Sequence, residues 1–212
     1  KREFLMLYYK TIDTKTLELL KEIQQVDIFK KLRLVGGTSL ALQIGHRVSV
    51  DLDFFGELTA DRISILNALN TLGEVKTLHY TENINVFTLN GIKIDIVNYP
   101  YPWLNPAVKD NELCLAGVKD ISAMKLAAIT GRGSKKDFVD IYFLLKQYSL
   151  DRMLDHYKQK YHDGSIFLVL KSLAYFDDAD NEIMPKMCEE IQWKTVKKEI
   201  AKKLKNYIKK EH

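Results

Sequence analysis

The chain has 212 residues, of which 46% are hydrophobic and 28% charged, ordinary values for a globular protein with a sizeable core. No stretch approaches the roughly 18 apolar residues of a membrane-spanning helix. The two cysteines lie far apart in the sequence, which predicts reduced thiols in a cytoplasmic protein. The five histidines lack the spacing of a zinc site. The net charge of +4 is uneven, because residues 193–211 carry eight lysines against two glutamates.

Helical and strand patterns alternate through the first half of the chain. The short strand LRLV leads into Gly36 and Gly37, and Thr38 is predicted as the N-cap of the helix that follows. Asn90-Gly91 is typical of the two-residue turn of a β-hairpin. The predicted elements are helices over 14–27, 38–44 and 59–73 and strands over 32–35, 49–55, 74–80, 84–89 and 92–97.

The second half is predicted to be helical. After the aromatic loop NYPYPWLNP, helical patterns recur near 120–130, 135–147, 151–161, 165–175 and 192–209. This order predicts an α+β fold, in which a mixed β-sheet with flanking helices is followed by a helical C-terminal region. We expect two domains, an α/β core with an N-terminal helix over 1–110 and a helical domain over 111–212.

Aspartates on two predicted strands point to a phosphate site. Alternation along SVDLDFF places Asp51 and Asp53 on one face, and alternation along GIKIDIVNY places Asp95 on the same face as Lys93. If the two strands are neighbours, three carboxylates converge, and they repel one another unless hard cations such as Mg²⁺ lie among them. Two metal ions held in this way are a common device for in-line phosphoryl displacement.

The glycine pair adds to this prediction. Gly36 and Gly37 let other groups approach the backbone closely, and the helix that follows offers N–H groups and a positive dipole end to a phosphate. Each feature also has a simpler interpretation. The strand aspartates are compatible with a solvated edge, Asp95 with an ion pair to Lys93 or an arginine, and the glycines with an ordinary turn.

Four motifs carry a resemblance to a known family. GGTSLALQIGHRVSVDLDFF resembles the signature of nucleotidyltransferases of the DNA polymerase β-like superfamily, and most closely that of the AbiEii/AbiGii-type toxin family. KIDIVNYP is similar to the family's second motif, and DISAMKLAAITGRGSKKDFVDIYFLL to its third and fourth. The motifs follow the family's order over roughly residues 30 to 146, so the resemblance implies a nucleotidyltransferase-like sheet.

The resemblance implies a role for each motif residue. The predicted nucleotide-binding residues are Gly36, Gly37, Thr38, Ser39 and Lys136, and the predicted catalytic residues are Asp51, Asp53, Asp95, Lys125 and Asp137. Asp51, Asp53 and Asp95 would bind Mg²⁺, and Asp95 would also help to activate the attacking hydroxyl. Lys125 would neutralise phosphate charge, and Asp137 would be a further polar group at the site.

The residues themselves leave alternatives open. Ser134 and Asp137 have the spacing of a capping box. Lys125 lies in an apolar stretch, so an alternative is that its aliphatic chain packs there while its ammonium reaches solvent. Arg47 either faces the substrate or pairs with a strand aspartate. The aromatic loop residues Tyr99, Tyr101 and Trp103 either stack on a base or pack beneath the loop. The C-terminal lysines form a solvated face or a basic rim for RNA.

The resemblance implies that the protein moves a nucleotide from an NTP to an acceptor in the presence of Mg²⁺ and releases pyrophosphate. The expected acceptor is RNA, above all tRNA, and the expected role is that of the toxin in a toxin–antitoxin or abortive-infection system, with an antitoxin partner and no membrane. Two alternatives stay open. One is transfer to a small molecule or a protein hydroxyl, and the other is a non-catalytic nucleotide-binding module.

Overall fold

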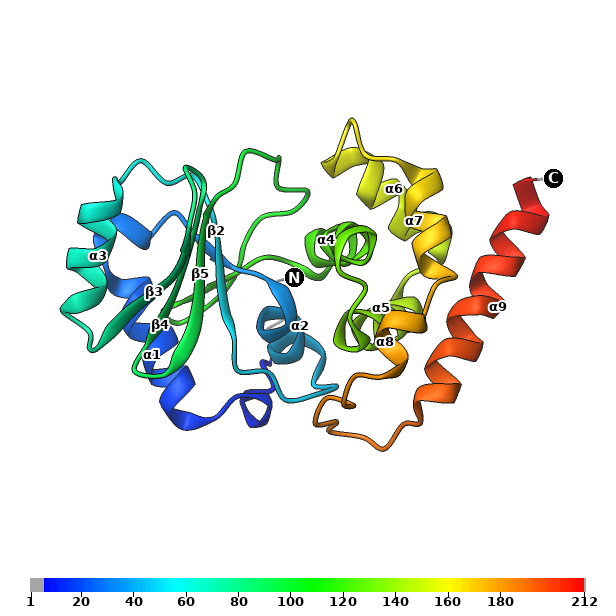
Figure 1. The fold of residues 1–212 in the computed structure, drawn as a ribbon, viewed down its shortest axis with the longest axis horizontal. Coiled ribbons are helices and arrows are strands. Elements are labelled where there is room, and N and C mark those ends of the chain that lie inside the picture. The colour runs from blue at the N-terminus through cyan, green and yellow to red at the C-terminus, as the bar shows by residue number, and fades with distance from the viewer. Residues whose placement is uncertain (1–5, 212) are drawn as a thin grey trace. The chain divides into compact units, whose positions relative to one another are not determined.

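The computed structural model of the protein describes residues 6–211, which form two compact units (Figure 1). The first unit contains the chain up to Tyr101 together with Pro106–Gly117, and the second contains Pro102–Asn105 and the chain from Val118 onward. The domain boundary expected after residue 110 falls at the turn of a hairpin in the first unit. We therefore propose that the first domain extends to Gly117.

The described part of the first unit is built on a seven-stranded mixed sheet in the order β3-β4-β5-β2-β1-β7-β6. The strands are β1 (Arg33–Leu34), β2 (Leu52–Gly56), β3 (Val75–Tyr80), β4 (Ile84–Leu89), β5 (Ile92–Asn98), β6 (Val108–Asp110) and β7 (Leu113–Leu115). The pairs β2–β5 and β1–β7 are parallel, and the other neighbouring pairs are antiparallel. The expected α+β fold with a mixed sheet is confirmed.

One face of this sheet forms the core of the first unit. Leu52 and Phe54 of β2 and Ile94 and Ile96 of β5 are fully buried, as the alternating pattern predicts. They belong to one apolar cluster with residues of the helices α1 (Thr14–Gln25) and α3 (Arg62–Asn70). Burial of each such side chain contributes about 1.5–3 kcal/mol. The opposite face of β2 and β5 is therefore the face that carries the polar residues.

Glycines set the limits of α2 (Gly36–Ile44), the helix between β1 and β2. The prediction that Thr38 caps this helix is wrong, because the helix already begins at Gly36, and Val35 is its N-cap. At its other end Gly45 has a φ of +70°, and it stops the helix as expected. The two remaining short helices of this unit are the 3₁₀ turns η1 (Tyr9–Thr11) and η2 (Asp27–Phe29).

Helices make up the second unit: α4 (Val118–Gly131), α5 (Lys135–Gln147), α6 (Leu150–Lys160), α7 (Ile166–Leu173), α8 (Asp177–Asp180) and α9 (Trp193–Glu211). The long helix α9, red in Figure 1, buries Val196, Ile200 and Leu204 against its neighbours. Trp193 lies at its start, with ring contacts to Phe138 and Phe176. Among the described residues, no helix combines the length and apolar character needed to cross a membrane.

Candidate active site

Two neighbouring parallel strands bring acidic residues together on the polar face of the sheet. Asp53 of β2 and Asp95 of β5 are register partners, and paired strands lie only about 4.8 Å apart. Asp51 directly precedes β2, two residues from Asp53 and therefore on the same side of the chain. All three residues are half-buried. The structure thus places Asp51, Asp53 and Asp95 on one face of neighbouring strands, which is the condition under which the sequence pattern brings them together.

Lys93 accompanies these carboxylates. Its Nζ donates a hydrogen bond to Asp95 Oδ1 at 2.7 Å. Burial lowers the pKa of Lys93, but the hydrogen bond to Asp95 and the charge of Asp95 outweigh burial and raise it overall. The charges of Asp53 and Asp51 raise the same pKa further. Lys93 therefore lies in the negative field of all three aspartates.

The donor set fits a hard divalent cation. Carboxylate oxygens are the ligands that Mg²⁺ prefers, and three carboxylates lie on one face of adjacent strands. Within residues 6–211, however, no three His, Cys, Asp or Glu side chains are grouped closely enough to hold a metal ion as they stand. Asp95 is bound to Lys93 instead. Metal binding therefore requires the side chains to turn toward one another.

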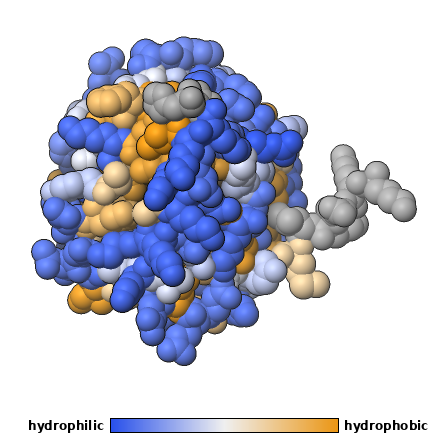
Figure 2. Space-filling model, turned by 90° about the vertical axis from the view of Figure 1, so that its right-hand side faces the viewer, coloured by the Kyte–Doolittle hydropathy of each residue, from blue (hydrophilic) through white to orange (hydrophobic). Residues whose placement is uncertain are grey.

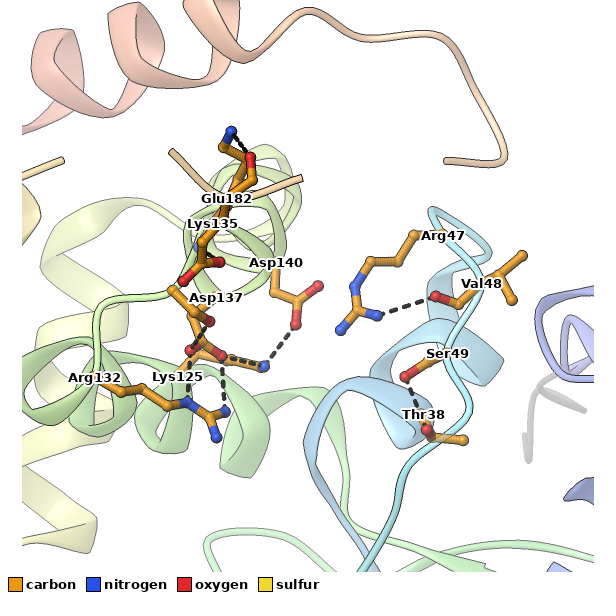
Figure 3. Close-up of polar contacts among 11 residues, drawn as sticks. Thr38, Arg47, Val48, Ser49, Lys125, Arg132, Lys135, Asp137, Asp140 and Glu182 are labelled. Carbon is orange, nitrogen blue, oxygen red and sulfur yellow. Dashed lines mark hydrogen bonds and ion pairs between the residues drawn. The ribbon is translucent and has the colours of Figure 1, made fainter. Parts of the chain in front are cut away.

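The start of α2 is packed against two charged side chains, which explains the glycine pair. A Cβ at Gly36 would lie 2.1 Å from Asp53 Oδ2, and Gly36 has a φ of +66°, where only glycine is unstrained. A Cβ at Gly37 would lie 2.1 Å from Nη2 of Arg47. Arg47 is buried, and its Nη1 donates to the Val48 carbonyl (Figure 3). The glycines therefore let a carboxylate and a guanidinium reach the end of a helix.

The hydroxyls of Thr38 and Ser39 form hydrogen bonds to other residues of the first unit. Thr38 Oγ1 lies 2.9 Å from Ser49 Oγ (Figure 3). The same Oγ1 donates to the backbone carbonyl of Asp51. Ser39 is fully buried, and its Oγ donates to the carbonyl of Ala116 at 3.2 Å. Thr38 thus fixes the segment that carries Asp51, while the nucleotide-binding roles of Thr38 and Ser39 remain predictions.

Lys125, Arg132 and Asp137 come together in the second unit. Lys125 is buried, and its Nζ lies 2.8 Å from Asp137 Oδ1 and 2.6 Å from Asp140 Oδ2 (Figure 3). Arg132, whose side chain is 61% exposed, donates from Nε to Asp137 Oδ2 at 2.8 Å. Both aspartates are fully buried. A buried carboxylate pair is thus held by one buried and one exposed cation.

Asp137 is an ionised group at the start of α5. Burial raises its pKa, but the charges of Lys125 and Arg132 and their hydrogen bonds lower it far below its ordinary value. Ser134 is the N-cap of α5, yet its hydroxyl donates to Asp137 Oδ2 and does not accept a backbone N–H. The capping-box interpretation is therefore wrong in its bonding, although the helix start is correct. Lys136, the residue directly before Asp137, is half-buried.

Sequence reasoning missed a second buried ion pair in the helical unit. Lys160 Nζ lies 2.8 Å from Asp120 Oδ1, and both side chains are fully buried. The same carboxylate accepts the backbone N–H groups of Leu104 and Asn105, and the Lys160 ammonium lies over the ring of Trp103. Lys160 lies on the apolar face of α6, and a lysine at such a position is the sequence feature that could have indicated a buried ion pair. Trp103 is thus engaged in packing within its own unit.

The mixed sheet, the acidic strand pair and the glycine-lined helix start are the features expected of a nucleotidyltransferase. The chain matches the family model described as Nucleotidyl transferase AbiEii toxin, Type IV TA system, over residues 18–206. The chain therefore belongs to the AbiEii family of nucleotidyltransferase toxins of type IV toxin–antitoxin systems, and this membership implies an NTP substrate and an antitoxin partner.

One curated relative is similar to the chain in sequence, and solved structures are similar to it in fold. The uncharacterized protein aq_aa25 of Aquifex aeolicus (strain VF5) is 36% identical over 197 residues, covering 90% of this chain and 95% of its own length. MenT4, nucleotidyltransferase toxin Rv2826c from Mycobacterium tuberculosis H37Rv, has a TM-score of 0.58 at 14% identity and covers 90% of this chain and 82% of its own. JHP933 from Helicobacter pylori has a TM-score of 0.56 at 16% identity, with 94% of each chain covered. The two structural likenesses show the shared fold.

Proposed function

We propose that the protein transfers a nucleotide from an NTP to RNA in a Mg²⁺-dependent reaction that releases pyrophosphate. The observation that carries this proposal is the register pairing of Asp53 with Asp95 on the polar face of the sheet. A bound Mg²⁺ would neutralise phosphate charge and lower the pKa of a coordinated hydroxyl. Such phosphoryl chemistry depends mainly on positioning and electrostatics, which the strand aspartates and the start of α2 would supply.

The strand aspartates have two roles in the proposal. Asp51 and Asp53 would hold the metal, while Asp95 would hold it and accept the proton of the attacking hydroxyl. Thr38 supports this arrangement, because its hydroxyl bonds to the Asp51 carbonyl and fixes the start of β2. The helix start at Gly36 and Gly37 would receive the triphosphate on its backbone N–H groups. Lys125 and Lys136 belong to the second unit, where Lys125 is paired with Asp137 and Asp140, and the roles of both lysines toward phosphate remain predictions.

The proposal that the acceptor is RNA rests on the exposed lysines of α9. Seven of its eight lysines are exposed, and Lys197 is the one that is half-buried, paired with Asp180. Figure 2 looks at the side of the second unit on which α9 lies, where hydrophilic residues surround a band of hydrophobic ones. A row of exposed lysines attracts the phosphates of RNA, with a strength that falls steeply as salt rises. A small neutral acceptor would gain nothing from it.

Label transfer tests the proposed function directly. The protein would be incubated with each of the four NTPs, labelled at the α-phosphate, in Mg²⁺ and with total RNA, total protein or a panel of antibiotics in separate reactions. We expect label in the RNA alone, and only while Mg²⁺ is present. Label confined to protein or to a small molecule would contradict the RNA acceptor, and the absence of label from every acceptor would contradict the transfer reaction.

A variant of α9 tests the acceptor surface. The variant replaces four exposed lysines along one stripe of the helix with glutamine: Lys198, Lys202, Lys205 and Lys209. We expect a higher KM for RNA, an unchanged kcat and a salt dependence of KM that is weaker by about one unit of log–log slope per lysine that contacts phosphate. The matched control removes four exposed lysines of the first unit: Lys30, Lys31, Lys76 and Lys109. Equal behaviour of the two variants would show that α9 does not contact RNA.

Gly36→Ala tests the close approach at the start of α2. The new Cβ would overlap Asp53 Oδ2 and would occupy a left-handed φ, so we expect the carboxylate to be displaced. Misplacement of a reacting group by about 1 Å costs roughly 100-fold in rate, and the strained backbone costs about 1–3 kcal/mol of stability. Label transfer and urea unfolding measure the two effects. Gly131→Ala is the control, because a Cβ there meets no atom within 4 Å, and a wild-type rate for Gly36→Ala would refute the expected displacement.

A further inference from the structure

The polar face of the sheet contains a cation of its own. Lys93 lies two residues before Asp95 on β5, so the two side chains project from the same face. Their charged groups are 2.7 Å apart. The side chain of Lys93 is 43% exposed and that of Asp95 is 23% exposed. The ion pair is therefore close, but it is open enough to solvent to be broken.

Lys93 also lies close to Asp51, the aspartate that directly precedes β2. The parallel pairing of β2 with β5 includes Leu52 with Ile94, so Lys93 stands beside the residue that precedes Leu52, which is Asp51. Asp51 and Lys93 line the same cavity of about 520 Å³ in the first unit. One ammonium thus lies among carboxylates that would otherwise face one another across neighbouring strands.

We propose that Lys93 is a resident counter-ion of the group Asp51, Asp53 and Asp95, and that it competes with the divalent cation for Asp95. The inference rests on the proposed function, because it assumes that these carboxylates bind metal. Without a metal, the ammonium offsets the mutual repulsion of the carboxylates. When a metal binds, Asp95 must leave Lys93, and a unit positive charge stays beside a divalent ion. Lys93 is thus a positioning residue that weakens metal binding and holds the carboxylates in a resting arrangement.

Mn²⁺ binding to the full chain without nucleotide tests this competition. Free Mn²⁺ is measured by electron paramagnetic resonance during titration of the wild type and of Lys93→Met. We expect Lys93→Met to bind Mn²⁺ about tenfold more tightly, because the variant removes a unit charge that repels the ion at short range. Mn²⁺ should accordingly raise the Tm of Lys93→Met more than that of the wild type. Lys93→Gln repeats the measurement, so that the result does not depend on the folding of one variant.

Two controls and two opposite outcomes make the test decisive. Lys93→Arg keeps the charge and should bind Mn²⁺ like the wild type, and so should Lys76→Met, which removes an exposed lysine paired with Glu74 on β3. Equal or weaker Mn²⁺ binding by Lys93→Met and Lys93→Gln overturns the inference and leaves the metal site standing. Failure of the wild type and of both variants to bind Mn²⁺ overturns the metal site itself, and the inference with it.

Discussion

Replacing Asp53 with asparagine is expected to abolish nucleotide transfer and to leave the fold intact. Asp53 lies on the polar face of the sheet, next to Asp95 and against the start of α2. Asparagine keeps the shape of the side chain, but it loses the charge that a divalent cation needs. A metal ion supplies several kcal/mol of transition-state stabilisation, so we expect the rate to fall at least about 10³-fold. Label transfer and the Tm are the two measurements.

Asp61→Asn is the matched control for this substitution. Asp61 is an exposed aspartate of the same unit, and its side chain accepts the N–H of Ser64 as the N-cap of α3. Asparagine is an equally good N-cap, so both the rate and the Tm should remain at wild-type values. Asp95→Asn should lose activity as Asp53→Asn does. Full activity in either site variant would refute the metal assignment, whereas loss of the fold would show that the carboxylates have a structural role.

The fold could be predicted wherever hydrophobic periodicity extended over several turns or strand residues. The alternation of SVDLDFF and GIKIDIVNY correctly separated the buried residues from Asp53 and Asp95. Asn90-Gly91 marked its hairpin because both residues adopt a positive φ, 52° and 83°. The short strand β1 lies within the strand predicted over 32–35, but the three-residue strands β6 and β7 and the four-residue helix α8 are too short to show a period and were not predicted. The sheet therefore extends further along the chain than the sequence pattern indicated.

The candidate site was predictable in its members and much less so in its contacts. The strand positions of Asp53 and Asp95 follow from a period of two, whereas their adjacency depends on a parallel pairing that only the tertiary structure sets. Lys93 was foreseen as one possible partner of Asp95, and the structure selects it. The α2 start was misjudged at Thr38 because threonine is a preferred N-cap residue, whereas the actual N-cap is Val35, an apolar residue that is rare at this position.

Buried ion pairs were the hardest feature to foresee. Lys125 was assigned either to phosphate or to an apolar surface along its stem, and the structure gives it two buried aspartates, Asp137 and Asp140. Its partners lie on α5, more than ten residues away, so no local spacing reveals the contact. Lys160 and Asp120 illustrate the same difficulty across α4 and α6. Long-range charge pairing is decided by how the helices pack, and a sequence period contains no record of it.

Replacing Lys125 with methionine is expected to destabilise the second unit more than any surface substitution. The variant leaves the fully buried Asp137 and Asp140 without the cation that lies within 2.8 Å of both. Removal of one partner from a buried ion pair costs about 3–5 kcal/mol, and urea unfolding at pH 7 measures this loss. Lys210→Met is the control, because its pair with Asp151 is exposed and spans 3.6 Å, so its cost should stay below about 1 kcal/mol.

The pH dependence of the same measurement identifies charge as the cause. The folded-state pKa of Asp137 lies below its ordinary value, so the stability that it contributes is present at neutral pH and is lost as pH falls through the folded pKa. In Lys125→Met the buried carboxylates take up protons at a higher pH, so the deficit relative to the wild type should shrink below about pH 5. Lys125→Met combined with Asp140→Asn should recover much of the lost stability, since Asp137 keeps Arg132. A deficit that is constant with pH and unrelieved in the double variant would point to lost packing and not to an unpaired charge.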